Sequence, residues 1–380
     1  MFISATVDGQ NTNHELTTRL VHAMNGEAHV DLKTTWHGID NDALKSYHLI
    51  HIFGCWNIAS IRLLSKAHRL HIPTVYSPMG GLQPWVIRKH RSSMQYSYQR
   101  EAIRKASAVH VCSKLESDLF ARLDWNSRSV LIKNPILTNL ITFGQMSAAM
   151  LALYEKVLDT NARLLLDDHS RQAIGNLLEL GVDKDVLFDH KHCQAMKANL
   201  ALLTPIQWRR VMIYAFDEKI EDILKKGLER IQFVAPHIVI EQIDRFPGTR
   251  PYPDGGLQGH ELCYHQPSTL SKLDENLKAS ETNERTLCVQ MLNLRHEVSR
   301  HAVPLRHLAD IYVTLRFKDM DEDRLREIAA EMGLSDFAGR LMAVLGDVMR
   351  LSEGFMPFPV KDDRATRELT QAITKFNTWA

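Results

Sequence analysis

The chain has 380 residues, of which 44% are apolar and 24% are charged, so it is long enough for two or three domains and has the composition of a folded protein rather than a disordered one. Its formal net charge of +1 gives no overall reason to expect nucleic acid as a partner. The five cysteines form no Cys-x-x-Cys pair, which argues against a disulfide scaffold and against a structural zinc site.

The beginning of the chain, MFISATVDGQNTNHEL, lacks the charged start and long apolar core of a signal peptide. No apolar run reaches the roughly 18 residues that a membrane-spanning helix needs. Together with the unpaired cysteines, these features predict a cytoplasmic protein.

Residues 1–142 alternate between short apolar runs and segments with helical spacing. Strands are expected at residues 2–7, 30–36, 48–54, 73–78, 108–113 and 129–135. Helices are expected between them, at residues 16–24, 56–72, 98–107 and 115–124. Strands that alternate with helices through short connections predict a doubly wound parallel sheet. We therefore expect an α/β, Rossmann-like domain over residues 1–142.

The apolar pattern changes to a helical period from Phe143 onward. Residues 146–159, 170–181, 205–231 and 286–298 all read as helices, and so does 321–336, which has acids at its start and Gly333 at its end. Residues 246–260 hold three prolines and four glycines and are expected to form a loop. The predicted organisation is a helical region at 143–245, a Pro/Gly-rich loop and linker at 246–285, and a helical bundle at 286–380.

The segment SPMGGLQPW, residues 77–85, follows a predicted strand at its carboxyl end, where open α/β sheets bind ligands. Gly80 and Gly81 allow the backbone to approach a ligand closely, and Trp85 offers a ring that can stack on a sugar. A rigid turn whose tryptophan packs inward fits the same residues, and the spacing does not decide between the two.

This loop belongs to a larger block, residues 48–138, that covers about a quarter of the chain. The block resembles the N-terminal, acceptor-side domain of GT-B glycosyltransferases of family 4, particularly bacterial enzymes that build surface polysaccharides. The matching segments are HIFGCW (51–56), IPTVYSPMGGLQPWVIRK (72–89), KASAVHVCSKLESDLF (105–120) and VLIKNPI (130–136).

The resemblance implies transfer of a sugar from a nucleotide-sugar donor to a glycan or lipid-linked acceptor of surface polysaccharide. The nucleotide sugar would be a co-substrate, and neither a cofactor nor a metal is expected. No catalytic base can be named. The positions that the resemblance places along a substrate cleft are His51, Gly54, Trp56, Ser77, Met79, Gly80, Gly81, Gln83 and Trp85.

Two features depart from the family pattern. Met79 stands where the family often has a histidine near the reacting sugar, and a thioether cannot take up a proton. The family also holds its donor with a C-terminal α/β domain that carries a pair of glutamates. Glu353 copies the first of them, but Lys361 stands at the second, and no glycine-rich phosphate loop follows residue 143. The alternative is a non-catalytic or split-transferase subunit whose helical half binds a partner protein, for which a second transferase subunit is one candidate.

Residues 85–105 contain six Lys or Arg and one acid, Glu101, with aromatic residues between them. Such a stretch suits peripheral contact with anionic lipid at the inner face of the cell membrane. A solvated helix face is the simpler interpretation of the same pattern.

Four weaker candidates have structural interpretations. Ser113 and Glu116 read as a helix capping box, and Cys112 as a buried strand residue rather than a nucleophile. The acidic pair 167–168 reads as a helix start rather than a metal site, and the ligands in HKHC (190–193) are too closely spaced for zinc.

Overall fold

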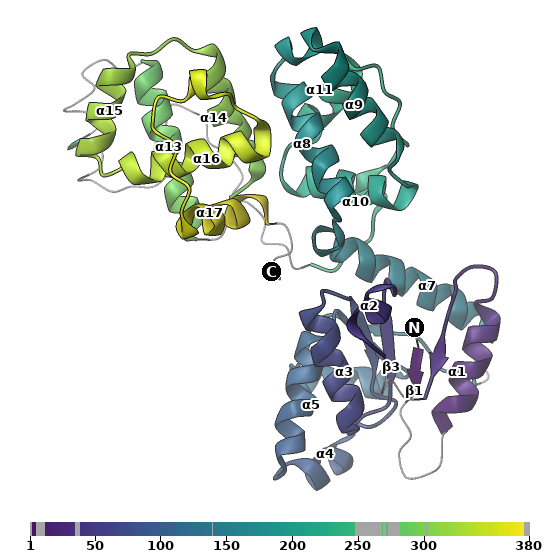
Figure 1. Cartoon of the computed structure of the whole chain (residues 1–380). Coiled ribbons are helices and arrows are strands. Elements are labelled where there is room, and N and C mark those ends of the chain that lie inside the picture. Colours follow the sequence, from purple (N-terminus) through teal and green to yellow (C-terminus); the bar gives the residue numbers. More distant parts are fainter. Residues whose placement is uncertain are drawn as a thin grey trace. The chain divides into compact units, whose positions relative to one another are not determined.

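The computed structural model describes residues 2–4, 12–34, 39–138, 140–247, 268, 271–272, 282–300 and 303–375. The chain divides into two compact units (Figure 1). The first contains the described residues up to Asn161 together with Gln242–Pro247, and the second contains Ala162–Glu241 and the described residues after 247.

The first unit is built on a parallel sheet of six strands in the order β2-β1-β3-β4-β5-β6. The strands are β1 (Phe2–Ser4), β2 (Leu32–Lys33), β3 (Ile50–Phe53), β4 (Thr74–Ser77), β5 (Ala108–Val111) and β6 (Ser129–Leu131). Every residue of β3, β4 and β5 is buried, which explains why their sequences read as unbroken apolar runs. The predicted α/β class with a parallel sheet is confirmed. Strand β2 is shorter than predicted, and parts of the first two predicted strands (5–7 and 35–36) lie outside the described residues.

Helices cover both faces of this sheet (Figure 1). Alternate strand residues such as Ile52 and Tyr76 face one apolar cluster, and Phe53 and Val75 face the other. The first face is covered by α3 (Ile58–Arg69), α5 (Met94–Lys105) and α6 (Lys114–Leu123). The second is covered by α1 (Thr12–Ala23) and α7 (Phe143–Thr160). Two short helices were not predicted, α2 (Asn41–Lys45) and α4 (Pro84–His90).

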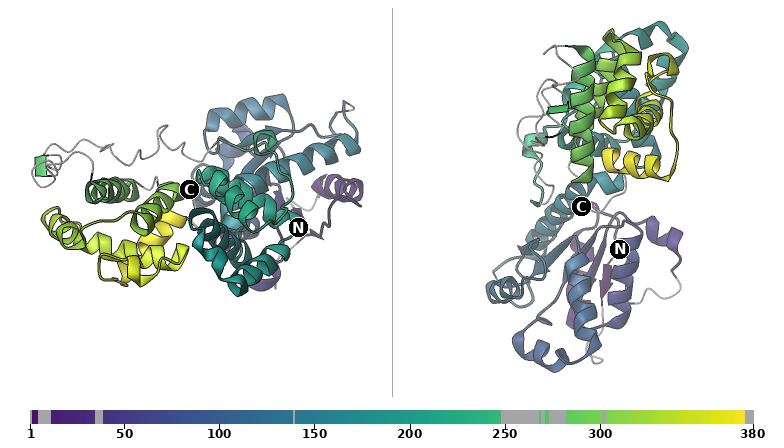
Figure 2. Two further views of the ribbon diagram at one scale, coloured as in Figure 1. Left: turned by 90° about the horizontal axis from the view of Figure 1, so that it is seen from above. Right: turned by 90° about the vertical axis from the view of Figure 1, so that its left-hand side faces the viewer.

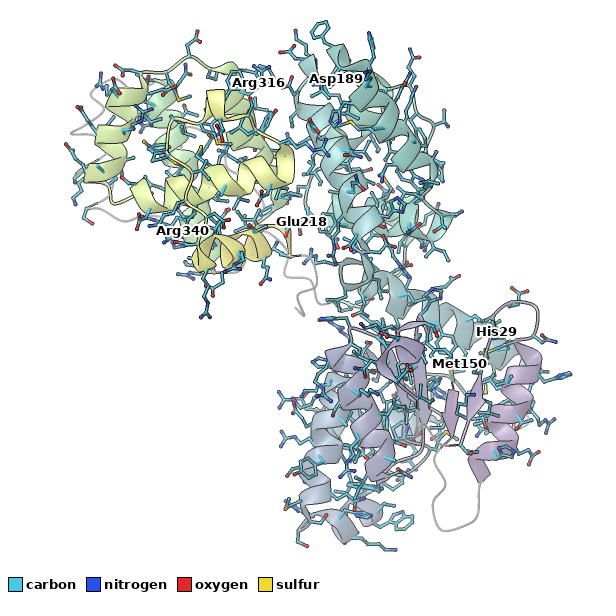
Figure 3. The ribbon with its side chains drawn as sticks, in the orientation of Figure 1. His29, Met150, Asp189, Glu218, Arg316 and Arg340 are labelled. Atoms are coloured by element: carbon cyan, nitrogen blue, oxygen red, sulfur yellow. The ribbon has the colours of Figure 1, made fainter. Side chains whose placement is uncertain are left out.

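The first unit extends past the predicted boundary at residue 142. Helix α7 buries Met150 and its neighbours in the sheet's second apolar cluster (Figure 3). The segment 242–247 returns to α7, where the Phe246 N–H donates to Thr160 Oγ1 at 2.9 Å and Lys156 Nζ donates to Asp244 at 3.0 Å. Helix α7 is therefore part of the first unit, because it covers the second face of the sheet. Of the predicted loop 246–260, residues 248–260 lie outside the described part of the chain.

The second unit is helical, as predicted: within the described residues that follow β6, every regular element is a helix. Its α-helices are α8 (Asp168–Val182), α9 (His190–Ala201), α10 (Pro205–Asp217), α11 (Glu221–Arg230), α13 (Asn283–Ser299), α14 (Leu305–Phe317), α15 (Glu322–Glu331), α16 (Ser335–Met349) and α17 (Arg364–Thr374). Short 3-10 turns lie at Ala162–Leu165, Asp185–Phe188, Ile240–Gln242 and Glu353–Phe355.

One apolar core joins the helices of the second unit. Figure 2 shows the ribbon of these helices from two further directions. Helices α8 and α11 approach so closely at Gly181 that a Cβ on this residue would lie 2.2 Å from the carbonyl oxygen of Ile223. The helical pattern at 205–231 is divided between α10 and α11, because Lys219 takes a left-handed φ of 57°.

Candidate functional site

The carboxyl ends of β3 and β4 carry the two loops that the sequence predicts to line a cleft. They lie next to the point where the strand order reverses, between β1 and β3, and this is where doubly wound sheets bind ligands. Trp56, in the loop after β3, donates from Nε1 to the carbonyl oxygen of Gly81, in the loop after β4, at 2.7 Å. A Cβ on Gly81 would lie 2.6 Å from Cys55 Cβ, so only glycine fits this contact. The two loops therefore form one packed edge.

Both loops contain backbone conformations that side chains rarely adopt. Trp56 has φ 62° and Met79 has φ 53°, and Gly80 follows Met79 with φ 79°. A bulky residue in this region is strained, and the strain persists only where neighbouring groups enforce it. The side chains of Glu116 and Gln99 hold the two loops in these conformations through hydrogen bonds to the backbone.

Glu116 fixes the loop after β4. Its carboxylate accepts hydrogen bonds from the backbone N–H groups of Gly80 and Cys112, both at 2.7 Å. The predicted capping box is therefore only half correct. The Ser113 hydroxyl does accept the Glu116 N–H at 3.1 Å, but the Glu116 carboxylate bonds the N–H groups of Cys112 and Gly80 instead of the Ser113 N–H. These two N–H groups are consequently already bonded to an anion that the protein supplies.

Gln99 fixes the loop after β3. Its side-chain oxygen accepts the Trp56 N–H at 2.8 Å, and its amide nitrogen donates to the Tyr76 hydroxyl at 3.0 Å. The Trp56 ring also stacks on His90, with ring centroids 4.2 Å apart. Gln99 was not predicted as a site residue, although its spacing from Ala102 and Ile103 places it on the buried side of α5.

Beneath the loops, four side chains form a buried hydrogen-bonded chain. His51 contacts the Tyr154 hydroxyl through Nδ1 and the Ser77 hydroxyl through Nε2, both at 2.7 Å. Ser77 Oγ lies 2.6 Å from His110 Nδ1, and His110 Nε2 lies 2.9 Å from the carbonyl oxygen of Ile132. Because a carbonyl only accepts, His110 Nε2 must carry the proton, and Ser77 then donates to Nδ1. His51 in turn donates to Ser77 and accepts from Tyr154, so one direction of donation satisfies the whole chain with both imidazoles neutral.

The pKa values agree with that assignment. Burial lowers the pKa of His110 to about 4, and burial together with His110 holds the pKa of His51 well below its ordinary value. Burial also raises the pKa of the Cys112 thiol, which donates to Met79 Sδ at 3.6 Å. Cys112 is thus a buried thiol rather than a thiolate nucleophile.

The nine residues predicted to line the cleft differ in accessibility. His51, Gly54 and Ser77 are buried and support the loops from within. Trp85 is 58% exposed, and Lys89 Nζ lies 5.2 Å from its ring centroid. The other five positions, Trp56, Met79, Gly80, Gly81 and Gln83, are partly exposed.

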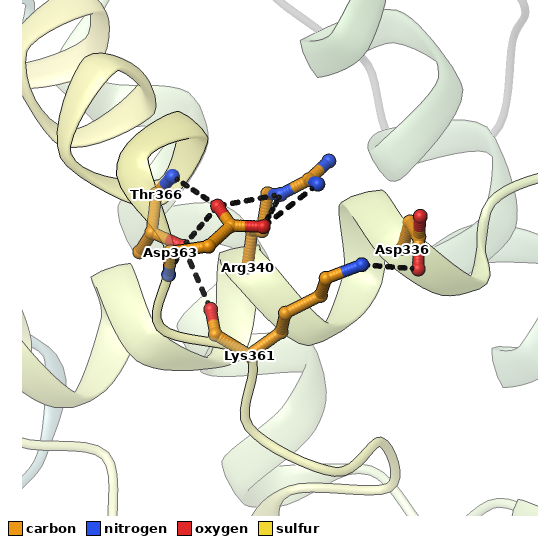
Figure 4. Close-up of polar contacts among 5 residues, drawn as sticks. All are labelled: Asp336, Arg340, Lys361, Asp363 and Thr366. Carbon is orange, nitrogen blue, oxygen red and sulfur yellow. Dashed lines mark hydrogen bonds and ion pairs between the residues drawn. The ribbon is translucent and has the colours of Figure 1, made fainter.

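The segment that copies the start of a donor motif, residues 351–363, connects α16 to α17. Asp363 accepts two hydrogen bonds from Arg340, at 3.1 and 2.9 Å, and accepts the Thr366 N–H at 3.0 Å at the start of α17 (Figure 4). The Arg340 guanidinium holds the pKa of Asp363 well below its usual range. Lys361, at the position of the second glutamate, donates to Asp336 at 2.7 Å (Figure 4). These contacts join helices and leave the segment with a structural role.

Other charged candidates in the helical unit are also engaged in structural contacts. Glu218, labelled in Figure 3, lies 2.8 Å from Arg163 and 3.5 Å from Lys375, and burial lowers the pKa of Lys375 to about 8. Asp167 caps α8, as predicted for the acidic pair 167–168, and Asp189 caps α9, which was not predicted. Within the described ranges no group of three or more His, Cys, Asp or Glu side chains is placed to hold a metal ion.

Comparisons with protein-family models, with curated proteins and with solved structures gave no match. Among the helices that the structure describes, none is both long and apolar enough to cross a membrane.

Proposed function

We propose that this chain is a glycosyltransferase-like protein of surface polysaccharide biosynthesis, whose sheet unit binds a sugar substrate at the carboxyl edge of β3 and β4. One observation carries the proposal. The loop 77–85, which belongs to the block that resembles family 4 enzymes, lies at the carboxyl end of β4 and is bonded to the loop after β3 through Trp56 and Gly81. This edge adjoins the reversal of strand order, where the general rule for open sheets places ligands.

The chemistry of the exposed groups supports a carbohydrate ligand. Trp85 presents an indole face with a cationic neighbour, Lys89, and Gln83 adds an amide that can both donate and accept hydrogen bonds. An aromatic face together with a few placed polar groups is the usual composition of a small-molecule site. As a transferase, the protein would pass a sugar from a nucleotide sugar to a glycan or lipid-linked acceptor.

A specific observation also favours the alternative of a split or non-catalytic transferase. Met79 occupies the position of the family's histidine, and the neighbouring N–H groups of Gly80 and Cys112 are taken by Glu116. The described elements after β6 are helices, whereas the family's donor domain is α/β. In this alternative a second transferase subunit supplies the donor site, and the helical unit binds that subunit.

Thermal shifts of the full chain with UDP-, GDP- and dTDP-sugars test the proposal. A ligand at a hundred times its dissociation constant stabilises the native state by about 2.7 kcal/mol, which such a scan detects. We expect one donor class to stabilise the wild type and Trp85→Ala to abolish the shift. Phe188→Ala, which removes an aromatic ring that is 83% exposed on the other unit, is the matched control and should keep the shift. If no donor shifts the wild type and the protein co-purifies with a second transferase, the split-transferase alternative holds instead.

A further inference from the structure

Helices α4 and α5 are neighbours in the sheet unit (Figure 1), and both carry large apolar side chains that are exposed. In α4 the buried residue is Ile87, and Trp85 lies about half a turn away from it on the helix. In α5 the buried side carries Gln99, Ala102 and Ile103. Met94 and Tyr98 are four residues apart, so they share one side of the helix, which flanks the buried side. Trp85 is 58% exposed, Met94 is 73% exposed and Tyr98 is 56% exposed. These are large side chains to leave in water on two adjacent helices.

The same two helices and the turn between them concentrate positive charge. Six cations lie between residues 85 and 105, namely Arg88, Lys89, Arg91, Arg100, Arg104 and Lys105. The acid of the stretch, Glu101, lies 3.3 Å from Lys105 and 3.9 Å from Arg104. Because the whole chain has 46 basic and 45 acidic residues, the basic excess of this stretch exceeds that of the entire molecule. The cationic surface is therefore local.

We propose that this α4–α5 face binds the surface of a bilayer that contains anionic phospholipid. The cations would face the phosphates, and Trp85, Met94 and Tyr98 would enter the headgroup layer. Aromatic and aliphatic side chains beside Lys and Arg on a helix surface suit a lipid interface. Nucleic acid is a less suitable ligand for this face, because the exposed Met94 side chain forms no strong hydrogen bond to a phosphate or to a base edge. Trp85 belongs both to this face and to the proposed sugar site, so the variants that test lipid binding leave Trp85 unchanged.

Sedimentation of the full chain with lipid vesicles tests the proposal. We expect binding to vesicles of phosphatidylglycerol mixed with phosphatidylcholine, weaker binding at high salt, and none to pure phosphatidylcholine. Each cation near an anionic surface contributes about a fivefold change in affinity, so Arg88→Glu combined with Arg91→Glu should weaken binding by about thirtyfold or more. The matched control is Lys191→Glu with Lys197→Glu, which makes the same charge change at exposed positions on α9 and should leave binding within about twofold.

A second variant separates lipid insertion from general electrostatic attraction. Met94→Ser with Tyr98→Ser changes two exposed side chains, so the thermal unfolding midpoint should stay near that of the wild type. This variant should lose the part of vesicle binding that persists at high salt. The proposal is overturned if the Arg88/Arg91 variant binds vesicles as tightly as the wild type does. It is also overturned if the wild type binds duplex RNA or DNA in preference to anionic vesicles, since the face would then serve nucleic acid.

Discussion

Acidification should destabilise the sheet unit through the buried chain of His51, Ser77 and His110. With both imidazoles neutral, His110 Nδ1 accepts from Ser77 and His51 Nδ1 accepts from Tyr154. A proton added to His110 Nδ1 would force the Ser77 hydroxyl, 2.6 Å away, to reverse its direction of donation, and it would leave a positive charge in a fully buried site. The folded state therefore resists protonation, whereas the unfolded chain accepts a proton at the ordinary pKa of histidine.

The magnitude follows from the pKa of His110, which is about 4 in the folded protein. With a pKa of about 6.5 in the unfolded chain, the unfolded state binds more protons between these two values, so stability falls as the pH is lowered through that window. The contribution is complete above about pH 6.5, and at about pH 5 His110 alone has lost about 2 kcal/mol of it. The lowered pKa of His51 acts in the same direction.

Hydrogen exchange of the peptides that cover β3, β4 and β5 measures this free energy in the sheet unit itself. We compare the wild type with His110→Gln at about pH 7.5 and about pH 5, since glutamine keeps an amide donor but does not titrate in this range. The variant is less stable at the higher pH, and its deficit should shrink by about 2 kcal/mol at the lower pH. Replacement of His22, which is exposed on α1, is the control and should change neither value.

Histidine nitrogen shifts give a second readout that needs no mutation. We expect both His51 and His110 to appear as neutral Nε2–H tautomers at about pH 5, where ordinary histidines are charged. The reasoning fails if either ring is protonated there, or if wild type and His110→Gln lose stability in parallel.

Three further predictions concern other contacts. Gly181→Ala should destabilise the helical unit by about 2–4 kcal/mol in denaturant unfolding, because the added Cβ would meet the backbone of α11. Gly144→Ala, where a Cβ has room, is the control and should be neutral or stabilising. Equal effects of the two substitutions would disprove the close packing of α8 and α11. Glu116→Gln should lower the unfolding free energy by about 1–3 kcal/mol, because the amide NH2 group would face a backbone N–H donor. Asp118→Asn, at an exposed site of the same helix, is the control and should have little effect. An unchanged stability of Glu116→Gln would show that the two hydrogen bonds contribute nothing. Burial lowers the pKa of Lys375 to about 8, so the stability of the wild type relative to Lys375→Met should rise as the pH increases from about 8 to about 10. A difference in unfolding free energy that does not change with pH would show that Lys375 is solvated in the folded protein.

The sequence predicted the sheet because the pattern that marks its strands is local. All four residues of each of β3, β4 and β5 are buried, and such runs bounded by turns are legible without a structure. Helix α7 was predicted as a helix, but its spacing carries no information about which core it covers. Only the structure shows that Met150 belongs to the sheet's apolar cluster. The break after α10 was missed for a similar reason, because the left-handed φ of Lys219 leaves no trace in the apolar period.

The supports of the candidate site could not be predicted because they join residues far apart in the sequence. Glu116 reaches Gly80 across 36 positions and Gln99 reaches Trp56 across 43. The capping-box motif accounts for Ser113 and Glu116 from four consecutive residues, so the sequence gives no indication that Glu116 also contacts Gly80. The observed Glu116 contact instead ties the start of α6 to the strained turn after β4.

These supports bear on what the sheet unit can do alone. Met79 keeps a left-handed φ of 53° although its side chain offers no proton acceptor, and Glu116 holds the following Gly80 N–H. The shape of the loop is therefore maintained by internal contacts and not by a group that could perform acid–base chemistry there. Under the proposed function, the accessible Trp85 and Gln83 would bind and orient a sugar, and the chemistry would depend on another surface. Co-purification and donor-induced stabilisation must therefore be measured on the same preparation.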